Sequence, residues 1–344
     1  MTHHKQMTEE TPGTPEISVI VPIRNEEAHI ASTLRQLLDQ EQDGIDVEIL
    51  VADGRSTDRT REIVSEMAIE NSQIRLFDNP IKLSSGARNV GVQQAAGQYL
   101  LIIDGHCEIP SRTYFKNLKA AFERTGADCL GRPQPLDVTN ATLLQQAIAA
   151  ARNSRLGHHP DSFIYSQKEL KVPAISVAVA YKREVFDQVG PFDTGFDACE
   201  DCELNHRIDQ AGLTCFLVPE LAVKYQPRNS LTGLFKQLTR YGRGRVRLAR
   251  KHAERLSLSS LLPALFLIGL LTGPLFASLI PLLGYVYWGV ISFYLILVVG
   301  FSCIAAWNNA NKRIIAWLPI VFFTVHLGSG WGVIREFMTR PKQR

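Results

Sequence analysis

Two carboxylates stand directly after apolar, strand-like segments, where parallel sheets bind their ligands. The run 99–103 leads into Asp104, with His106 two residues later, and the run 47–51 leads into Asp53 after one alanine. Ligands of open α/β sheets bind beyond the carboxyl ends of such strands. We therefore expect Asp104 and His106 to hold a divalent cation carrying a phosphorylated substrate, and Asp53 to accept hydrogen bonds from a base or a ribose. The competing interpretation is that each Asp only begins a turn.

Further charged residues are placed to assist at the same crevice. Pro22 and Glu26 follow another strand-like run. Arg88 lies at a predicted helix start, where free N–H groups and a guanidinium favour a phosphate; a solvated surface Arg is the alternative. Glu200 and Asp201 follow a loop containing Gly and Phe, which can present a general base to a bound hydroxyl. Acidic residues also commonly begin helices without any such role.

A basic stretch precedes the first long apolar segment. Its cations are Lys236, Arg240, Arg243, Arg245, Arg247, Arg250, Lys251 and Arg255. Helical spacing places Gln237, Arg240 and Tyr241 near one face, and Gly242 and Gly244 are expected to end that helical face at Tyr241. Such a stretch suits anionic headgroups at a membrane surface, a role that is compatible with catalysis.

Strand-like and helix-like patterns alternate through the first half of the chain. Their βαβαβαβ order predicts a mostly parallel sheet. The expected strands are 17–21, 47–51, 74–77 and 99–103, and the helices are 26–40, 56–67 with Ser56 as N-cap, and 84–96. Further on, helices are expected at 113–124 and 201–210 and an apolar strand at 174–181. No GxGxxG follows the first strand, which disfavours a dinucleotide-binding domain.

The last quarter of the chain is apolar enough for a bilayer. The segments 258–283 and 285–307 exceed the roughly 20 residues that a span needs, whereas 314–334 is weaker and holds His326. The positive-inside rule places the basic stretch in the cytoplasm. Three spans would then put the basic C-terminal residues outside, against that rule. Either the third segment is re-entrant or interfacial, or the short tail overrides the bias.

Five motifs, in this order, resemble those of the family-2 glycosyltransferases, whose nucleotide-sugar-binding domain has the GT-A fold. The motifs are Val-Pro-Ile-Arg-Asn-Glu (21–26), Ala-Asp-Gly-Arg-Ser-Thr-Asp (52–58), Ala-Arg-Asn-Val-Gly (87–91), Asp-Gly-His (104–106) and Glu-Asp (200–201). The resemblance covers about 17 to 250, and the variant motifs and apolar tail look most like the succinoglycan-type exopolysaccharide enzymes.

This resemblance implies an α/β chain in which a GT-A domain with a mostly parallel central sheet precedes C-terminal transmembrane helices. The expected parts are a disordered lead-in (1–15), the GT-A domain (16–229), a basic amphipathic membrane-interface segment (230–257), two or three membrane helices (258–335) and a basic tail (336–344).

The resemblance also implies roles for individual residues. Asp53 binds the uracil, Pro22 and Glu26 support the nucleotide site, Arg88 lies near the nucleotide, Asp104 lies near ribose and metal, and Asp201, beside Glu200, is the catalytic base. Gln237, Arg240 and Tyr241 look like a variant of Gln-x-x-Arg-Trp that contacts the acceptor or its diphosphate. His106 replaces the second Asp of the family's Asp-x-Asp motif. Because imidazole suits Mn²⁺ and later metals, this predicts a Mn²⁺ preference or an outer-shell role for His106.

The implied activity is inverting sugar transfer from a UDP-sugar to a lipid-linked saccharide, such as one carried on a polyprenyl diphosphate, in exopolysaccharide or cell-surface glycan synthesis. Mn²⁺ or Mg²⁺ is the expected cofactor. The expected location is the cell inner membrane with the catalytic domain cytoplasmic, and no nucleic-acid partner is expected. The alternative is a membrane-anchored sugar-nucleotide-binding or nucleotidyltransferase protein that transfers no sugar to lipid.

Overall fold

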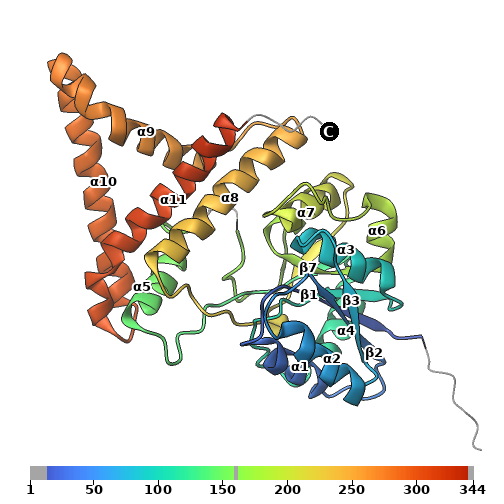
Figure 1. Ribbon diagram of the computed structural model, residues 1–344. Helices are drawn as coiled ribbons and strands as arrows, with labels where there is room; N and C mark the ends of the chain where they lie inside the picture. Colours follow the sequence, from blue (N-terminus) through green and yellow to red (C-terminus); the bar gives the residue numbers. More distant parts are fainter. Residues whose placement is uncertain (1–13, 159–161, 340–344) are drawn as a thin grey trace, which may run out of the picture.

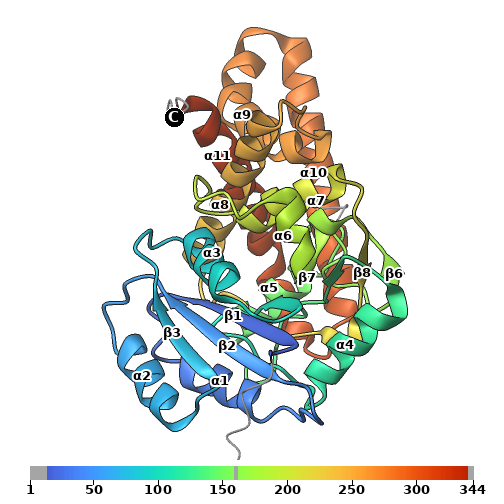
Figure 2. The same cartoon turned by 90° about the vertical axis from the view of Figure 1, so that its right-hand side faces the viewer.

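The structure is a computed structural model that describes residues 14–158 and 162–339. It consists of an α/β domain and a C-terminal group of long helices that projects from one side of that domain (Figures 1 and 2). The helices are α1 (Ile30–Leu38), α2 (Thr60–Glu70), α3 (Ser84–Gln94), α4 (Tyr114–Thr125), α5 (Leu143–Arg152), α6 (Arg183–Val189), α7 (Glu200–Gln210), α8 (Leu231–Lys251), α9 (Leu258–Leu279), α10 (Pro281–Trp307) and α11 (Leu318–Met338). Short 3₁₀ turns cover Ala174–Ser176, Pro219–Leu221 and Lys312–Ala316.

Eight strands form one sheet in the order β3-β2-β1-β4-β7-β5-β8-β6. Their bounds are β1 (Ile17–Ile23), β2 (Val47–Asp53), β3 (Ile74–Asp78), β4 (Tyr99–Ile102), β5 (Cys129–Gly131), β6 (Leu170–Lys171), β7 (Ala178–Lys182) and β8 (Cys215–Leu217). The first four strands run parallel to one another, as the alternating pattern predicted. β7 is antiparallel to both β4 and β5.

Helices cover both faces of this sheet because successive side chains of a strand point to opposite faces. Val19 and Val21 of β1 pack in one buried cluster with residues of α1, α2 and α4. Ile20 packs in a second cluster with residues of β4, β7 and α7. α3 lies very close to β1, since a Cβ on Gly91 would come within 2.3 Å of Ile20. The buried, continuously apolar strands that the sequence showed are thus the centre of a three-layer domain.

Several expected boundaries are wrong in detail. Ser56 does not cap a helix, because its side chain hydrogen-bonds Asp53 instead and α2 begins at Thr60. The expected strand 174–181 is a 3₁₀ turn followed by β7. The first two apolar segments are separated near Ile280 rather than Gly284.

The helix through the basic stretch does not end at Tyr241 but continues unbroken to Lys251. Glycine is needed at 242 and 244 because other chain segments lie too close to leave room for a side chain. A Cβ on Gly242 would lie 2.4 Å from the carbonyl oxygen of Ser329 in α11, and one on Gly244 would lie 2.3 Å from the sulfur of Cys199. The packing of α8 therefore overrides the low helix propensity of glycine.

Three helices are long and apolar enough to cross a membrane: α9, α10 and α11. α9 and α10 are largely exposed along their length, whereas α11 lies alongside α8 (Figure 1). The residues 340–344 of the predicted basic tail and most of the predicted lead-in 1–15 lie outside the described residues.

Candidate active site

The candidate site lies where β1, β2 and β4 end. Ile23, next to Pro22 at the end of β1, pairs with Asp53, the last residue of β2. Asp104 follows β4, which pairs with β1 on its other side. The sheet register thus places the two predicted carboxylates at one edge of the sheet, with half-buried Pro22 between their strands.

Asp53 is buried and belongs to a small hydrogen-bonded turn. Its Oδ1 accepts a hydrogen bond from the hydroxyl of Ser56 at 2.5 Å, and its Oδ2 lies 3.5 Å from a guanidinium nitrogen of Arg61. Arg61 also pairs with Asp78 at the end of β3. Asp53 therefore sits at the outer part of the strand-end crevice, apart from the other predicted carboxylates.

One carboxylate oxygen of Asp104 is held by a hydrogen bond, and the other faces the guanidinium of Arg88. The hydroxyl of Tyr225 donates to Oδ2 at 2.7 Å, and Oδ1 lies 3.8 Å from a nitrogen of Arg88. Burial alone would raise the pKa of this carboxyl, but Arg88, His106 and the Tyr225 hydrogen bond outweigh burial and lower it. Asp104 is therefore an ionised carboxylate with an oxygen available to a further ligand.

His106 is paired with the predicted nucleotide-site residue Glu26. Its Nδ1 lies 3.0 Å from Oε1 of Glu26, and its ring meets that of Tyr225 edge-on at 5.9 Å between centroids. The hydrogen bond to Glu26 raises the pKa of His106, despite partial burial. With Nδ1 engaged, Nε2 is the ring nitrogen left for any ligand.

Arg88 joins the strand-end carboxylate to the acidic start of α7. Its guanidinium lies 3.5 Å from Oε1 of Glu200 as well as 3.8 Å from Asp104, and it stacks over Phe192 at 5.4 Å. Burial would lower the pKa of Arg88, but Glu200, Asp201 and Asp104 together raise it. Its Nε is buried with no hydrogen-bond partner. One buried cation thus bridges two regions of the chain that the sequence singled out separately.

Asp201 lies in the first turn of α7, beside Glu200. One of its carboxylate oxygens accepts the backbone N–H of Cys202 at 2.8 Å. Cys199, the residue before α7, has a left-handed backbone with φ +62°, which makes a sharp bend before the helix. The bend separates the two neighbouring acids from the loop that leads to them. Asp201 remains partly exposed whereas Glu200 is buried.

α8 holds the loop that leads into these acids. Arg240 donates to the backbone oxygen of Asp197 at 2.6 Å, and Arg247 pairs with the Asp197 carboxylate. Gln237 donates to the hydroxyl of Tyr241 at 3.1 Å, so the three residues of the Gln-x-x-Arg-Tyr sequence lie together as the helical spacing predicted.

Tyr241 faces the same loop. The thiol of Cys199 at the end of that loop donates to the backbone oxygen of Tyr241 at 3.9 Å, and the Tyr241 side chain is exposed.

Two residues that the sequence did not single out complete the site. Tyr225 follows β8 and reaches Asp104 across 121 positions of sequence. Arg132 follows β5, is fully buried, and donates to the hydroxyl of Tyr114 at 3.1 Å. A charged residue directly after the short strand β5 was a usable signal for Arg132, whereas Tyr225 had none.

The donor set for a cation is small. Over residues 14–158 and 162–339, no three His, Cys, Asp or Glu side chains group as a metal site. Asp104 and His106 each have one donor atom not engaged in the hydrogen bonds described above. Such a pair fits a divalent cation that takes its remaining ligands from substrate phosphates, as Mg²⁺ commonly does.

Comparisons with known proteins identify the family and the fold of the chain. The family model described as glycosyl transferase family 2 matches residues 18–190, and the model of glycosyl transferase family group 2 matches residues 109–324. The succinoglycan biosynthesis protein ExoA of Rhizobium meliloti is 32% identical over 71% of this chain and 73% of its own length.

A second relative, from Methanococcus voltae, is similar over almost the whole chain. It is a dolichyl N-acetyl-α-D-glucosaminyl phosphate 3-β-D-2,3-diacetamido-2,3-dideoxy-β-D-glucuronosyltransferase, 23% identical over 93% of this chain and 96% of its own length. Among solved structures, a mannosyltransferase of Pyrobaculum calidifontis in complex with GDP-mannose and Mn²⁺ superposes with a TM-score of 0.58. That alignment has 17% identity and covers 92% of this chain and 88% of the other. The likeness confirms the predicted fold.

Proposed function

The chain belongs to glycosyl transferase family 2, and from that membership we propose that it transfers a sugar, with inversion, from a UDP-sugar to a lipid-linked saccharide, with Asp201 as the catalytic base. The chain is a glycosyltransferase with the GT-A fold and C-terminal apolar helices suited to membrane anchoring. The donor nucleotide, the acceptor and the residue roles are the proposed parts.

The observation that carries the proposal is the position of Arg88. Its guanidinium lies 3.8 Å from Asp104, at the nucleotide end of the site, and 3.5 Å from Glu200, next to the proposed base. A transferase needs the leaving diphosphate and the attacking hydroxyl on opposite sides of one anomeric carbon. Arg88 supports this arrangement because it holds the two halves of the site together and carries positive charge between them.

Asp201 supplies the proton acceptor in this scheme. The hydroxyl of the acceptor saccharide gives its proton to the Asp201 carboxylate while its oxygen attacks the anomeric carbon and the bond to the UDP oxygen breaks. Glu200 is engaged with Arg88, which leaves the partly exposed Asp201 as the carboxylate that faces an incoming substrate. A well-placed general base contributes about 10²–10⁴-fold to the rate.

The nucleotide is held by the strand ends. We propose that Asp53 accepts a hydrogen bond from the uracil, that Pro22 and Glu26 line the nucleotide site, and that Asp104 lies near the ribose and the metal. A divalent cation, when bound, neutralises negative charge on the leaving diphosphate. Asp104 and His106 are the residues that would hold the cation, and His106 favours Mn²⁺ over Mg²⁺ because imidazole is a softer ligand than a carboxylate.

The acceptor is proposed to carry its lipid in the membrane beside α8. Gln237, Arg240 and Tyr241 lie next to the loop that precedes Asp201. Lys236 and Arg245 of α8, which have no acidic partner among the described residues, suit a polyprenyl diphosphate. The relative from Methanococcus voltae, whose name gives a dolichyl phosphate sugar as its acceptor, supports this class of substrate. We propose that the catalytic domain faces the cytoplasm at the inner membrane.

The test is sugar transfer by purified Asp201→Asn protein. We expect UDP binding close to that of the unsubstituted enzyme and a rate lower by about 10²–10⁴-fold, measured as radiolabel from UDP-sugars entering a lipid-linked acceptor. Asp187→Asn is the matched control, because Asp187 is exposed on α6. Retained turnover in Asp201→Asn would refute the base assignment. A panel of UDP-glucose, UDP-galactose and their N-acetyl forms, with GDP-mannose alongside, tests the donor, and incorporation from GDP-mannose alone would refute the uridine assignment.

A further inference from the structure

α11 is long and apolar enough to span a bilayer, yet its N-terminal half contacts α5, whose chain leaves and re-enters the α/β domain, and its C-terminal half contacts α8. Just before α11, the side chain of Asn311 donates to Gln146 of α5 at 3.0 Å. Within the first half of the helix, Nε2 of His326 lies 3.0 Å from the backbone oxygen of Leu156. These contacts hold the N-terminal half of α11 against α5 and the turn that follows it, which pack with the C-terminal helices.

The other end of α11 is tied to the same domain through α8. Buried Glu336 accepts hydrogen bonds from Arg243 and Arg247, each at 2.9 Å. Arg247 in turn pairs with Asp197, in the loop that leads to the candidate base. A helix that crosses a bilayer brings its ends to opposite faces, about 30 Å of hydrocarbon apart. α5 lies in the chain between β5 and β6, so it stays on the side of the sheet, and Asp197 ties the other end of α11 to that side as well. Contacts at both ends with parts of the chain on one side of the membrane do not fit a helix that spans it.

The helix that α11 packs against is also unsuited to hydrocarbon. α8 and α11 run in the same direction in close contact, since a Cβ on Gly332 would lie 2.2 Å from the backbone oxygen of Thr239 and one on Gly328 would lie 3.0 Å from that of Phe235. α8 carries seven of the eight cations of the basic stretch and no acidic residue. If α11 crossed the membrane, α8 would cross beside it with these charges.

From these contacts we infer that only α9 and α10 cross the bilayer, as a hairpin. The pair α8–α11 then lies at the anionic membrane surface on the side of the catalytic domain, and residue 339 is on that same side. At 1.5 Å per residue, the 22 residues of α9 and the 27 of α10 measure about 33 and 40 Å. Both lengths exceed the hydrocarbon core of a bilayer, which is about 30 Å thick. Figure 1 shows both helices projecting from the α8–α11 pair and meeting at a corner.

The distribution of charges agrees with a two-helix hairpin. From Leu258 to Asn311 the sequence has no Asp, Glu, Lys or Arg, and the hairpin is flanked by Arg255 on one side and by Lys312 and Arg313 on the other. Both flanks, α8 and the basic residues after α11 then share one side of the membrane. This distribution satisfies the positive-inside rule, which three spans violate.

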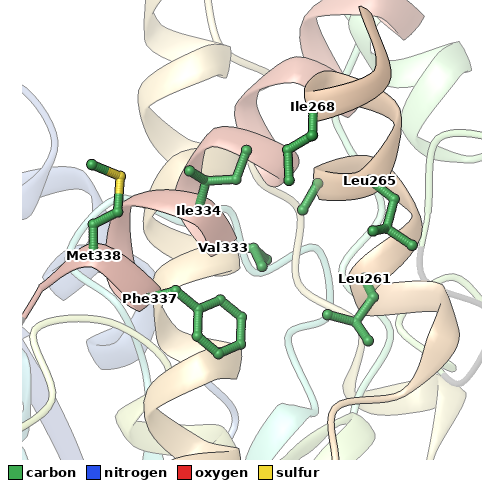
Figure 3. Close-up of a pocket in the computed structure, with 8 residues that line it drawn as sticks. Leu261, Leu265, Ile268, Val333, Ile334, Phe337 and Met338 are labelled. Atoms are coloured by element: carbon green, nitrogen blue, oxygen red, sulfur yellow. The ribbon is translucent and has the colours of Figure 1, made fainter. Parts of the chain in front are cut away.

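The outer surface of α11 suits a bilayer boundary. An apolar groove lies between α9 and α11, and Figure 3 shows Leu261 and Leu265 of α9 opposite Ile334 and Phe337 of α11. Glu336, the residue before Phe337, is turned to the arginines of α8 instead. α11 thus turns the Glu336 carboxylate toward α8 and leaves apolar side chains for lipid, as a helix lying in the membrane interface does.

The experiment is side-specific labelling of full-length enzyme in sealed membrane vesicles with a membrane-impermeant maleimide. Three single substitutions report three positions: Glu70→Cys on the catalytic domain, Ser278→Cys near the hairpin tip and Thr339→Cys after α11, all exposed in the structure. The unsubstituted enzyme, with its own six cysteines, gives the background. We expect Glu70→Cys and Thr339→Cys to be labelled from one face, and Ser278→Cys from the other.

Either of two results overturns the inference. Labelling of Thr339→Cys from the same face as Ser278→Cys means that α11 spans the membrane. Labelling of Ser278→Cys from the same face as Glu70→Cys means that the hairpin does not cross. A fluorescent protein fused after residue 344, which fluoresces only in the cytoplasm, gives an independent reading. Where Glu70→Cys is labelled from the cytoplasmic face, the inference requires this fusion to fluoresce, and a well-expressed dark fusion contradicts it. Labelling of Glu70→Cys from the other face would instead contradict the proposed cytoplasmic location.

Discussion

At the scale of single residues, Tyr225 decides how Asp104 can act. Its hydroxyl occupies Oδ2 of Asp104 at 2.7 Å, so the carboxylate has a fixed orientation and only Oδ1 is directed toward the crevice. Residues that orient a metal ligand from behind are typically as important as the ligand itself. Tyr225 is therefore a positioning residue for the proposed cation site.

Removing this hydroxyl should weaken cation use without disturbing the fold. We expect Tyr225→Phe to raise the Mn²⁺ concentration needed for half-maximal activity by about 10–100-fold, the usual effect of losing such a partner. Activity at increasing Mn²⁺, with thermal unfolding as the check on folding, measures the effect. Tyr99→Phe is the matched control, because Tyr99 stands at the opposite end of β4 and stacks on Phe122. Equal Mn²⁺ requirements in both variants would contradict the positioning role.

His106 gives a second prediction at this scale. If its Nε2 binds the cation, His106→Asp replaces an imidazole with a carboxylate, which suits Mg²⁺ better. We expect the ratio of activity with Mn²⁺ to activity with Mg²⁺ to fall in this variant. The measurement is the ratio itself, which is insensitive to a general loss of activity. An unchanged ratio would remove the support for direct ligation by His106.

At the scale of elements, the contact between α8 and α11 depends on the absence of side chains at their glycines. A Cβ on Gly242 would lie 2.4 Å from a backbone oxygen and 3.0 Å from a backbone nitrogen of α11, so the two helices would have to move apart. Backbone atoms cannot rotate away as a long side chain can. Overpacking of this kind costs about 1–3 kcal/mol.

We therefore expect Gly242→Ala to lower the thermal unfolding temperature in detergent and to reduce activity, because α8 also holds the loop before Asp201. Gly269→Ala in α9 is the control, since a Cβ there meets nothing within 4 Å. Alanine also has a higher helix propensity than glycine, so this substitution should not destabilise α9. A Gly242→Ala enzyme as stable as the Gly269→Ala enzyme would show that the helices separate at little cost.

At the scale of the whole molecule, one glutamate near the end of the described chain supports the catalytic loop. Glu336 accepts from Arg243 and Arg247, and these arginines also face Asp197, about 140 positions earlier in the sequence. The C-terminal helix is thereby connected to the loop that leads into α7, where Glu200 and Asp201 begin the helix. In the proposed scheme the membrane-associated part of the chain supports the candidate site as well as anchoring the enzyme.

Glu336→Gln should therefore lower the turnover rate more than it weakens UDP binding, because the nucleotide lies at the strand ends and the loop lies at α8. We expect a loss of about tenfold or more in the turnover rate, as for other displaced catalytic groups, with partial recovery in Glu336→Asp. Glu184→Gln, at an exposed position of α6, is the control. A uniform loss of binding and turnover would instead indicate a general defect in folding.

The sequence predicted well whatever depends on local pattern. The apolar runs before Asp53 and Asp104 identified both strand ends, and the helical spacing grouped Gln237, Arg240 and Tyr241. Contacts between distant segments could not be predicted, because Tyr225 and Glu336 have no local signal and reach their partners only after folding. The same limit explains the misplaced end of α8: glycine lowers helix propensity locally, while the close approach of α11, which needs glycine, is visible only in three dimensions.

The attachment of α11 at both ends has a geometric consequence for the substrate. In the proposed topology the catalytic domain cannot swing freely on a flexible stalk, so the proposed base Asp201 stays at a set height above the lipid surface. A saccharide whose lipid is anchored in the bilayer must bring its terminal hydroxyl to that height. We therefore expect the enzyme to use lipid-linked glycans that are long enough to reach that height and to reject shorter ones that carry the same terminal sugar.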